Sequence, residues 1–145
     1  MSKHLMRRIS MFFTGLFLIG ALNTSFAADK HKVVYHLGDK DKIEFALRNI
    51  SNHIEGVGGP DNIDIVLVVI GGAIDGIKTS VADEKIKTAL SKLSGQGVHL
   101  EACGNTMRHM KLELSDLVSG FSRRDEGGVV RLMELEEKGY SYIRP

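Results

Sequence analysis

The chain has a single cysteine, Cys103, which stands in the segment EACGNTMRHM. The residues before it, 98–102, predict a short strand, and those after it predict a helix that Asn105 or Thr106 caps and that ends near Lys111. A cysteine just ahead of a helix lies near unpaired backbone N–H groups and the positive end of the helix dipole. Both favour the thiolate, which is the nucleophilic form of the side chain. The segment therefore indicates a reactive thiol, and the alternative is a buried, inert cysteine.

Three other residues are candidates to support the thiol. Gly104 leaves room above the sulfur, and Arg108, about one turn into the predicted helix, would add positive charge if its side chain folded back. His36 lies at the end of the first predicted strand and could act as a base or hydrogen-bond partner of Cys103 if that strand neighbours the third. A histidine that is only hydrogen-bonded is the alternative at this position.

A glycine-rich segment, GGAIDG, follows the second predicted strand and begins with Gly71 and Gly72. It lacks the GxGxxG order and the acidic partner of a dinucleotide-binding loop, so we expect a tight loop that lines the same cleft as Cys103. The spacing of His99, Cys103 and His109 matches no common zinc pattern. The sequence therefore predicts no metal site, and it implies no organic cofactor.

Strands and helices alternate along the chain, and this alternation predicts how the candidate residues are positioned. The expected order is strand 32–37, helix 43–57, strand 62–70, helix 82–93, strand 98–102, helix 105–111, strand 120–124, helix 129–138 and strand 140–145. It predicts one α/β domain with a doubly wound, mainly parallel five-stranded sheet and helices on both faces. Sites in such sheets lie at the carboxyl ends of the strands, where His36, Gly71 and Cys103 fall.

Residues 1–27 have the layout of a cleaved signal peptide. Three basic residues precede the apolar run MFFTGLFLIGAL, and Ser25 and Ala27 supply the small residues ahead of a cleavage site. We therefore expect the folded domain to span residues 28–145 and the mature protein to be periplasmic or otherwise exported. An uncleaved membrane anchor is the alternative, because the uncharged stretch 9–28 is almost long enough to span a bilayer.

The charge of the chain argues against nucleic-acid binding. The chain has 19 Lys and Arg and 18 Asp and Glu residues, and removing Lys3, Arg7 and Arg8 with the signal peptide leaves 16 and 18, a net charge of −2. No basic patch or basic helix stands out in the sequence. We therefore expect no nucleic-acid partner and, after cleavage, no membrane partner.

Four segments give the domain a resemblance to a known family. They are KVVYHLGD at the first strand, LRNISNHIEGVG in the first helix, ACGNTM around Cys103 and the closing GVVRLMELEEKGYSYIRP. With these segments the sequence resembles the DsrE/DsrF-like family, in particular its small exported members. The resemblance implies a flavodoxin-like domain that assembles into trimers or hexamers. It also implies a sulfur-relay role, in which Cys103 matches the family's cysteine at a helix start and carries sulfur as a persulfide.

The leading functional hypothesis is a periplasmic sulfur carrier of the sulfurtransferase type, with Cys103 as the persulfide-carrying thiol. Its partner would be a sulfur donor or acceptor protein, or a small sulfane-sulfur compound. The expected supporting residues are Gly104, Asn105, Thr106, Arg108, Gly71 and Gly72. Two alternatives stay open: a non-catalytic oligomeric module that binds a small ligand or a partner, with the cysteine structural, and a redox sensor that forms a sulfenate or an intersubunit disulfide.

Overall fold

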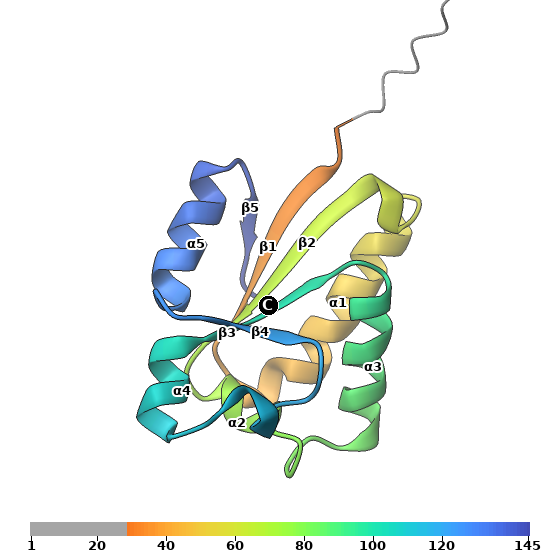
Figure 1. The fold of residues 1–145 in the computed structure, drawn as a ribbon. Coiled ribbons are helices and arrows are strands. Elements are labelled where there is room, and N and C mark those ends of the chain that lie inside the picture. The colour runs from red at the N-terminus through yellow and green to blue at the C-terminus, as the bar shows by residue number, and fades with distance from the viewer. Residues whose placement is uncertain (1–28) are drawn as a thin grey trace, which may run out of the picture.

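The sheet determines where every candidate residue lies. The computed structural model describes residues 29–145, and the predicted signal peptide, residues 1–27, lies outside them. The five strands of the sheet are all parallel, in the order β4-β3-β2-β1-β5 (Figure 1). They are β1 (His31–Leu37), β2 (Ile63–Val69), β3 (His99–Cys103), β4 (Phe121–Arg124) and β5 (Ser141–Ile143). All five predicted strands are confirmed.

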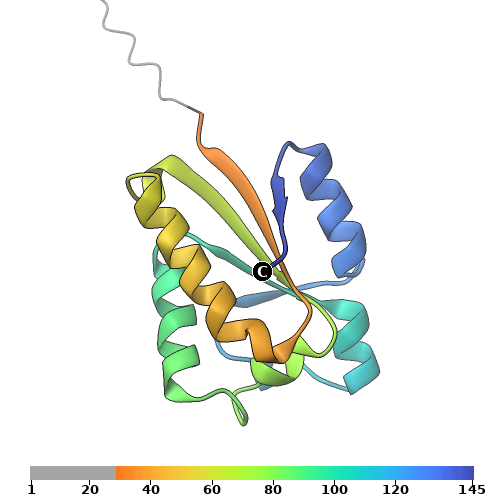
Figure 2. The same ribbon diagram turned by 180° about the vertical axis from the view of Figure 1, so that it is seen from behind.

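Helices lie on both faces of this sheet, as the alternation of elements predicts. They are α1 (Ile43–Gly56), α2 (Ala73–Gly76), α3 (Glu84–Gly95), α4 (Gly104–Met110) and α5 (Gly128–Glu137). Helices α1 and α3 cover one face, and α5 covers the other (Figures 1 and 2). The first three crossovers step across the sheet in one direction, while the last returns from β4 to β5 at the opposite edge. Because parallel crossovers are right-handed, the returning helix must lie on the opposite face.

Two local features differ from the sequence-based expectation, and both concern the carboxyl ends of strands. Part of the glycine-rich segment forms the short helix α2 instead of a loop alone. Helix α4 begins at Gly104 and has Cys103 as its N-cap, instead of Asn105 or Thr106. The reason is that pairing with β4 extends to Cys103, which holds that residue in the extended conformation required of a cap.

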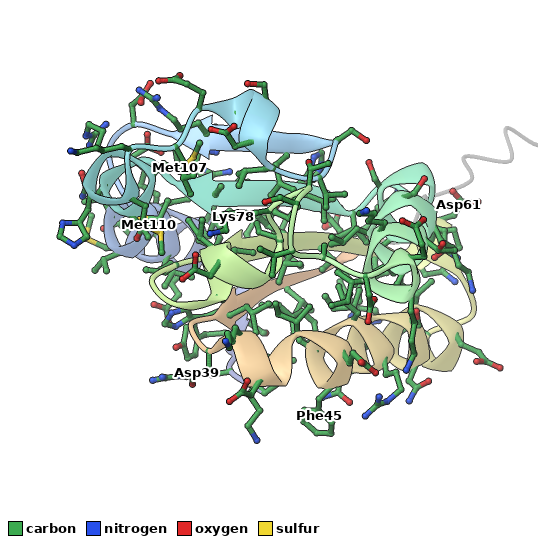
Figure 3. All side chains as sticks on the ribbon, turned by 90° about the horizontal axis from the view of Figure 1, so that it is seen from below. Asp39, Phe45, Asp61, Lys78, Met107 and Met110 are labelled. Carbon is green, nitrogen blue, oxygen red and sulfur yellow. The ribbon has the colours of Figure 1, made fainter. Side chains whose placement is uncertain are left out.

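The two faces of the sheet bury very different amounts of apolar surface. The larger core lies mainly beneath α1 and α3, and Phe45 on α1 points away from it into solvent (Figure 3). The smaller core lies beneath α5 and contains Val34, Val66, Val68, Leu132 and Leu135. Few buried apolar contacts therefore hold α5 on the sheet, so polar contacts have more influence on its position.

The outer surface of α5 is partly apolar. Val129 is 72%, Met133 51% and Val130 40% exposed, and Tyr142 in the neighbouring strand β5 is 42% exposed. Among residues 29–145, no helix has the length and apolar character needed to cross a membrane.

Candidate functional site

Cys103 lies where two helices begin. It ends β3 and caps α4, so it lies beside the unpaired N–H groups at the start of that helix. The first residue of α5, Gly128, donates its backbone N–H to Sγ of Cys103 with an N–Sγ distance of 3.2 Å. The sulfur is therefore held between the starts of α4 and α5, and Cys103 is only 4% exposed.

The pKa of Cys103 lies below the ordinary value of a thiol. Burial is the largest single influence and raises the pKa, because it disfavours the charged form. Hydrogen bonds from the Thr106 side chain and from the backbone N–H groups of Gly128, Thr106 and Asn105 lower the pKa and together outweigh burial. The surroundings of the sulfur thus favour the thiolate.

Three glycines permit the close packing around the sulfur. A Cβ on Gly128 would lie 2.6 Å from Cδ1 of Ile70, and a Cβ on Gly104 would lie 2.6 Å from a backbone carbonyl oxygen of β4. Gly127 has a φ of 97°, and a Cβ there would collide with the amide of Asn105. The space above Gly104 is therefore filled by the end of β4. Gly127 and Gly128 were missed from the sequence, where the available signal was a glycine pair directly before a helix.

Thr106 links the thiol to the glycine-rich segment. Its Oγ1 accepts a hydrogen bond from the backbone N–H of Gly71 at 3.1 Å, and its side chain also lowers the pKa of Cys103. Both glycines also lie beside the end of β1, since a Cβ on Gly71 or Gly72 would lie 3.8 or 3.7 Å from the carbonyl oxygen of Gly38. The structure therefore connects Gly71 to Thr106, whereas Gly72 makes no such contact.

Arg108 braces the turn between β4 and α5 and does not fold over the sulfur. Its Nη2 donates to the carbonyl oxygen of Asp125 at 3.1 Å, and its Nη1 lies 3.5 Å from Oδ1 of the same residue. It also donates to Oδ1 of Asn105. The expectation that Arg108 adds positive charge above Cys103 is therefore wrong. Arg108 and Asn105 instead hold the turn against α4.

Two residues before Cys103, Glu101 forms a buried ion-pair cluster that was not predicted from the sequence. Glu101 in β3 is 1% exposed. Arg131 of α5 donates to it from Nε at 2.8 Å and from Nη2 at 3.0 Å, and Arg124 of β4 also donates to it. Burial raises the pKa of Glu101, but the hydrogen bonds and charges of the two arginines outweigh it, so the pKa lies below the usual value. The available signal was an acidic residue inside an apolar strand, VHLEAC.

His36 is not brought to the thiol, because β2 lies between β1 and β3. The expectation that the first strand neighbours the third is wrong, and two strand spacings, about 9–10 Å, separate them. Nδ1 of His36 instead lies 2.7 Å from the hydroxyl oxygen of Tyr142 in β5. Burial lowers the pKa of His36, the charge of Arg144 lowers it further, and Asp39 raises it in part. His36 is therefore hydrogen-bonded to the neighbouring edge strand, β5.

The histidines near Cys103 form no metal centre in the described part of the chain. Within residues 29–145, no group of three His, Cys, Asp or Glu side chains could hold a metal ion. Nε2 of His99 lies 3.7 Å from a carboxylate oxygen of Asp64. A surface hollow of about 770 Å³ lies between α3 and residues 115–119, but Cys103 does not line it. With 4% of its surface exposed, Cys103 is nearly covered by the residues around it.

Comparisons with known proteins bear on the fold. No protein-family model and no curated protein matches the chain. The protein of unknown function MTH1491 from Methanobacterium thermoautotrophicum has a TM-score of 0.70 and 24% identity, over 80% of this chain and 100% of that one. The ychN protein from E. coli has a TM-score of 0.62 and 18% identity, over 79% and 99%.

A third solved structure, the protein of unknown function BT1422 from Bacteroides thetaiotaomicron, has a TM-score of 0.59 and 15% identity, over 83% of this chain and 99% of that one. At these identities, similarity between structures establishes a common fold and not a common activity. The chain therefore has the flavodoxin-like α/β fold that it shares with these proteins.

Proposed function

We propose that the protein is a sulfur carrier in which Cys103 accepts sulfane sulfur as a persulfide and passes it to an acceptor thiol. The observation that supports this proposal is the place of one buried sulfur at the start of α4, where the start of α5 donates a hydrogen bond to it and the pKa of the thiol is lowered. The thiolate is the attacking species in sulfur exchange. One cysteine suffices for a carrier, because the donor and the acceptor supply the other sulfur atoms.

The proposed transfer takes place in two balanced steps. The Cys103 thiolate attacks the outer sulfur of a persulfide or polysulfide; the donor's S–S bond breaks, and its remaining sulfur leaves with the electron pair. An acceptor thiolate then attacks the outer sulfur of the Cys103 persulfide, and the Cys103 thiolate leaves. Backbone N–H groups of Asn105, Thr106 and Gly128 would stabilise the negative charge that returns to Sγ.

Transfer requires a local opening, because Cys103 is 4% exposed. We propose that the opening takes place in the turn at residues 125–128, which covers the sulfur through Gly128. The outer part of this turn is held by Arg108 and Asp125, whose side chains are 49% and 71% exposed. Exposed ion pairs contribute only about 0–1 kcal/mol, so this contact can break without disturbing the core.

The proposal includes the family, location and assembly that the sequence resemblance implies: an exported, periplasmic protein of the DsrE/DsrF-like type that forms trimers or hexamers. The exposed apolar residues of α5, Val129, Val130 and Met133, support self-association. Sedimentation of the purified protein tests this part. A monomer at all concentrations would contradict the assembly and leave the role of Cys103 untouched.

A second candidate function is a binding module in which Cys103 is structural. The burial of Cys103 among core residues favours it, since free cysteines are often inert core side chains. In that case the thiol should react only after the domain unfolds. The two functions therefore differ in the reactivity of the folded protein.

Intact-mass spectrometry after incubation with polysulfide tests the carrier function. We expect the wild type to gain the mass of one sulfur atom and to lose it again on treatment with a reductant. Cys103→Ser, purified and treated in parallel, should gain nothing. A wild-type protein that takes up no sulfur while its unfolded form does would contradict the carrier and favour the binding module.

A further inference from the structure

We propose that Glu101 is a positioning residue for Cys103: by holding Arg131, it keeps the first turn of α5 in place so that the backbone N–H of Gly128 stays on Sγ. The inference rests on the proposed function, because it concerns the same thiol. Glu101 and Cys103 are two residues apart in β3, so their side chains leave the sheet on the same face. Glu101 makes no contact with the reacting sulfur in this proposal and acts only through α5.

A closed ring of contacts carries the proposal. Both carboxylate oxygens of Glu101 accept hydrogen bonds from Arg131, at 2.8 and 3.0 Å. The backbone N–H of Arg131 donates to the carbonyl oxygen of Gly127 at 3.1 Å, which closes the first turn of α5. The next residue, Gly128, donates to Sγ of Cys103 at 3.2 Å, and Cys103 returns the ring to β3. Each contact in the ring thus restricts the position of the next residue.

The geometry of the ion pair makes it suited to positioning. A guanidinium that donates two bonds to one carboxylate is fixed in direction as well as distance, which a lysine ammonium cannot reproduce. The apolar core beneath α5 is small, so it leaves the helix more freedom than the core beneath α1 and α3. Glu101 is 1% and the Arg131 side chain 15% exposed, so water weakens this pair far less than a surface pair.

Other charged and titratable groups face this pair from three elements. Arg124 of β4 donates to the same carboxylate, and Glu134 of α5 lies 3.5 Å from Nη1 of Arg131. Tyr140, which follows α5, donates its hydroxyl to Asp64 of β2. Burial and Asp64 raise the pKa of Tyr140, the charge of Arg131 lowers it and that of Glu101 raises it. A change in charge at Glu101 would therefore act on several groups, so the test needs variants that keep the charge.

Arg131→Lys keeps the charge but loses the two-pronged contact, and Arg124→Lys makes the same change at the other arginine of Glu101. The probe is the rate of iodoacetamide alkylation of Cys103 as a function of pH. For Arg131→Lys we expect the midpoint of this pH profile to rise by about one pH unit. This is the effect of losing one hydrogen bond to a charged group, here the bond from Gly128 to the thiolate. Arg124→Lys should leave the midpoint unchanged, because Arg124 lies on β4 and not on α5.

An unchanged midpoint in Arg131→Lys, or an equal rise in Arg124→Lys, would overturn the proposal. The second result would mean that Glu101 acts on the thiol through the general stability of the cluster. Circular dichroism of both variants checks that each is folded at the pH values used.

A second measurement needs neither the thiol's reactivity nor a lysine variant. In Glu101→Asp, which keeps the negative charge but is one methylene group shorter, we expect hydrogen exchange at the Gly128 amide to become at least tenfold faster, while the amides of β2 stay protected. Unchanged exchange at Gly128 would overturn the proposal. Neither measurement uses a sulfur donor. A protein that shows both effects but takes up no sulfur would therefore contradict the carrier function and still support the positioning role of Glu101.

Discussion

The carboxyl ends of β3 and β1 offer two reactive residue types, Cys103 and His36, at the same edge of one sheet. At the end of β3 a helix begins at once, so Cys103 lies beside its first N–H groups, and the start of α5 adds a hydrogen bond from Gly128 to Sγ. At the end of β1 a short loop and a 3-10 turn come next, and His36 contacts the side chain of Tyr142. The element next to each strand end therefore decides the chemistry there.

The two residues share a lowered pKa with opposite consequences. For Cys103, the hydrogen bonds that outweigh burial make the charged thiolate more available. For His36, burial and the charge of Arg144 lower the pKa and so favour the neutral ring. The β3 end is thus arranged to stabilise negative charge, and the β1 end to avoid positive charge.

Gly128→Ala should have the largest effect, because the added methyl group disturbs the hydrogen bond between Gly128 and Cys103 at the end of β3. The new Cβ would lie 2.6 Å from two carbons of the Ile70 side chain and 3.2 Å from Cβ of Cys103, so the Ile70 side chain or α5 must shift. We expect urea denaturation to show a loss of about 1–3 kcal/mol in the free energy of unfolding. The pKa of Cys103 should rise as the N–H moves away.

Gly95→Ala is the matched control. Gly95 ends α3, and a Cβ there would meet nothing within 4 Å. Alanine also favours the helix by up to about 1 kcal/mol, so this variant should be as stable as the wild type or more stable. Equal stability of Gly128→Ala and Gly95→Ala would contradict the close packing at Cys103.

Thr106→Val should have a smaller effect at the same strand end. It keeps the shape of the side chain but removes the hydroxyl that accepts from Gly71 and that lowers the pKa of Cys103. We expect a loss of about 1 kcal/mol in the free energy of unfolding and an upward shift of the thiol pKa. Thr88→Val, on the exposed surface of α3, should change neither quantity. A thiol pKa that stays at the wild-type value would remove Thr106 from the site.

Arg144→Gln should have the smallest effect, and it should be confined to the β1 end. Because Arg144 lowers the pKa of His36, its removal should raise that pKa, which NMR titration of the ring measures. A lowered pKa in the folded state means that the unfolded chain binds more protons, so stability falls as pH drops below about 6.5. Arg144→Gln should therefore lose less stability than the wild type when the pH falls below about 6.5. A change in Cys103 alkylation would show that the two strand ends are coupled.

Much of this architecture is determined by the sequence alone. The alternation of short apolar runs and helical spacing predicts the five strands and the main helices, because these patterns depend on neighbours a few residues apart. The same local information places Cys103 at the carboxyl end of a strand and ahead of a helix. Backbone N–H groups at a helix start are a direct consequence of that position.

Only the tertiary structure decided which of these residues meet. The position of β2 between β1 and β3 separates His36 from Cys103, and strand order depends on crossovers that no short segment encodes. The return of α5 over the other face brings Gly128 to the sulfur and Arg131 to Glu101, across 25 and 30 residues of chain. Such contacts form only when distant elements pack. For that reason the sequence located the thiol and the helix start beside it, and only the fold brought Gly128 to the sulfur.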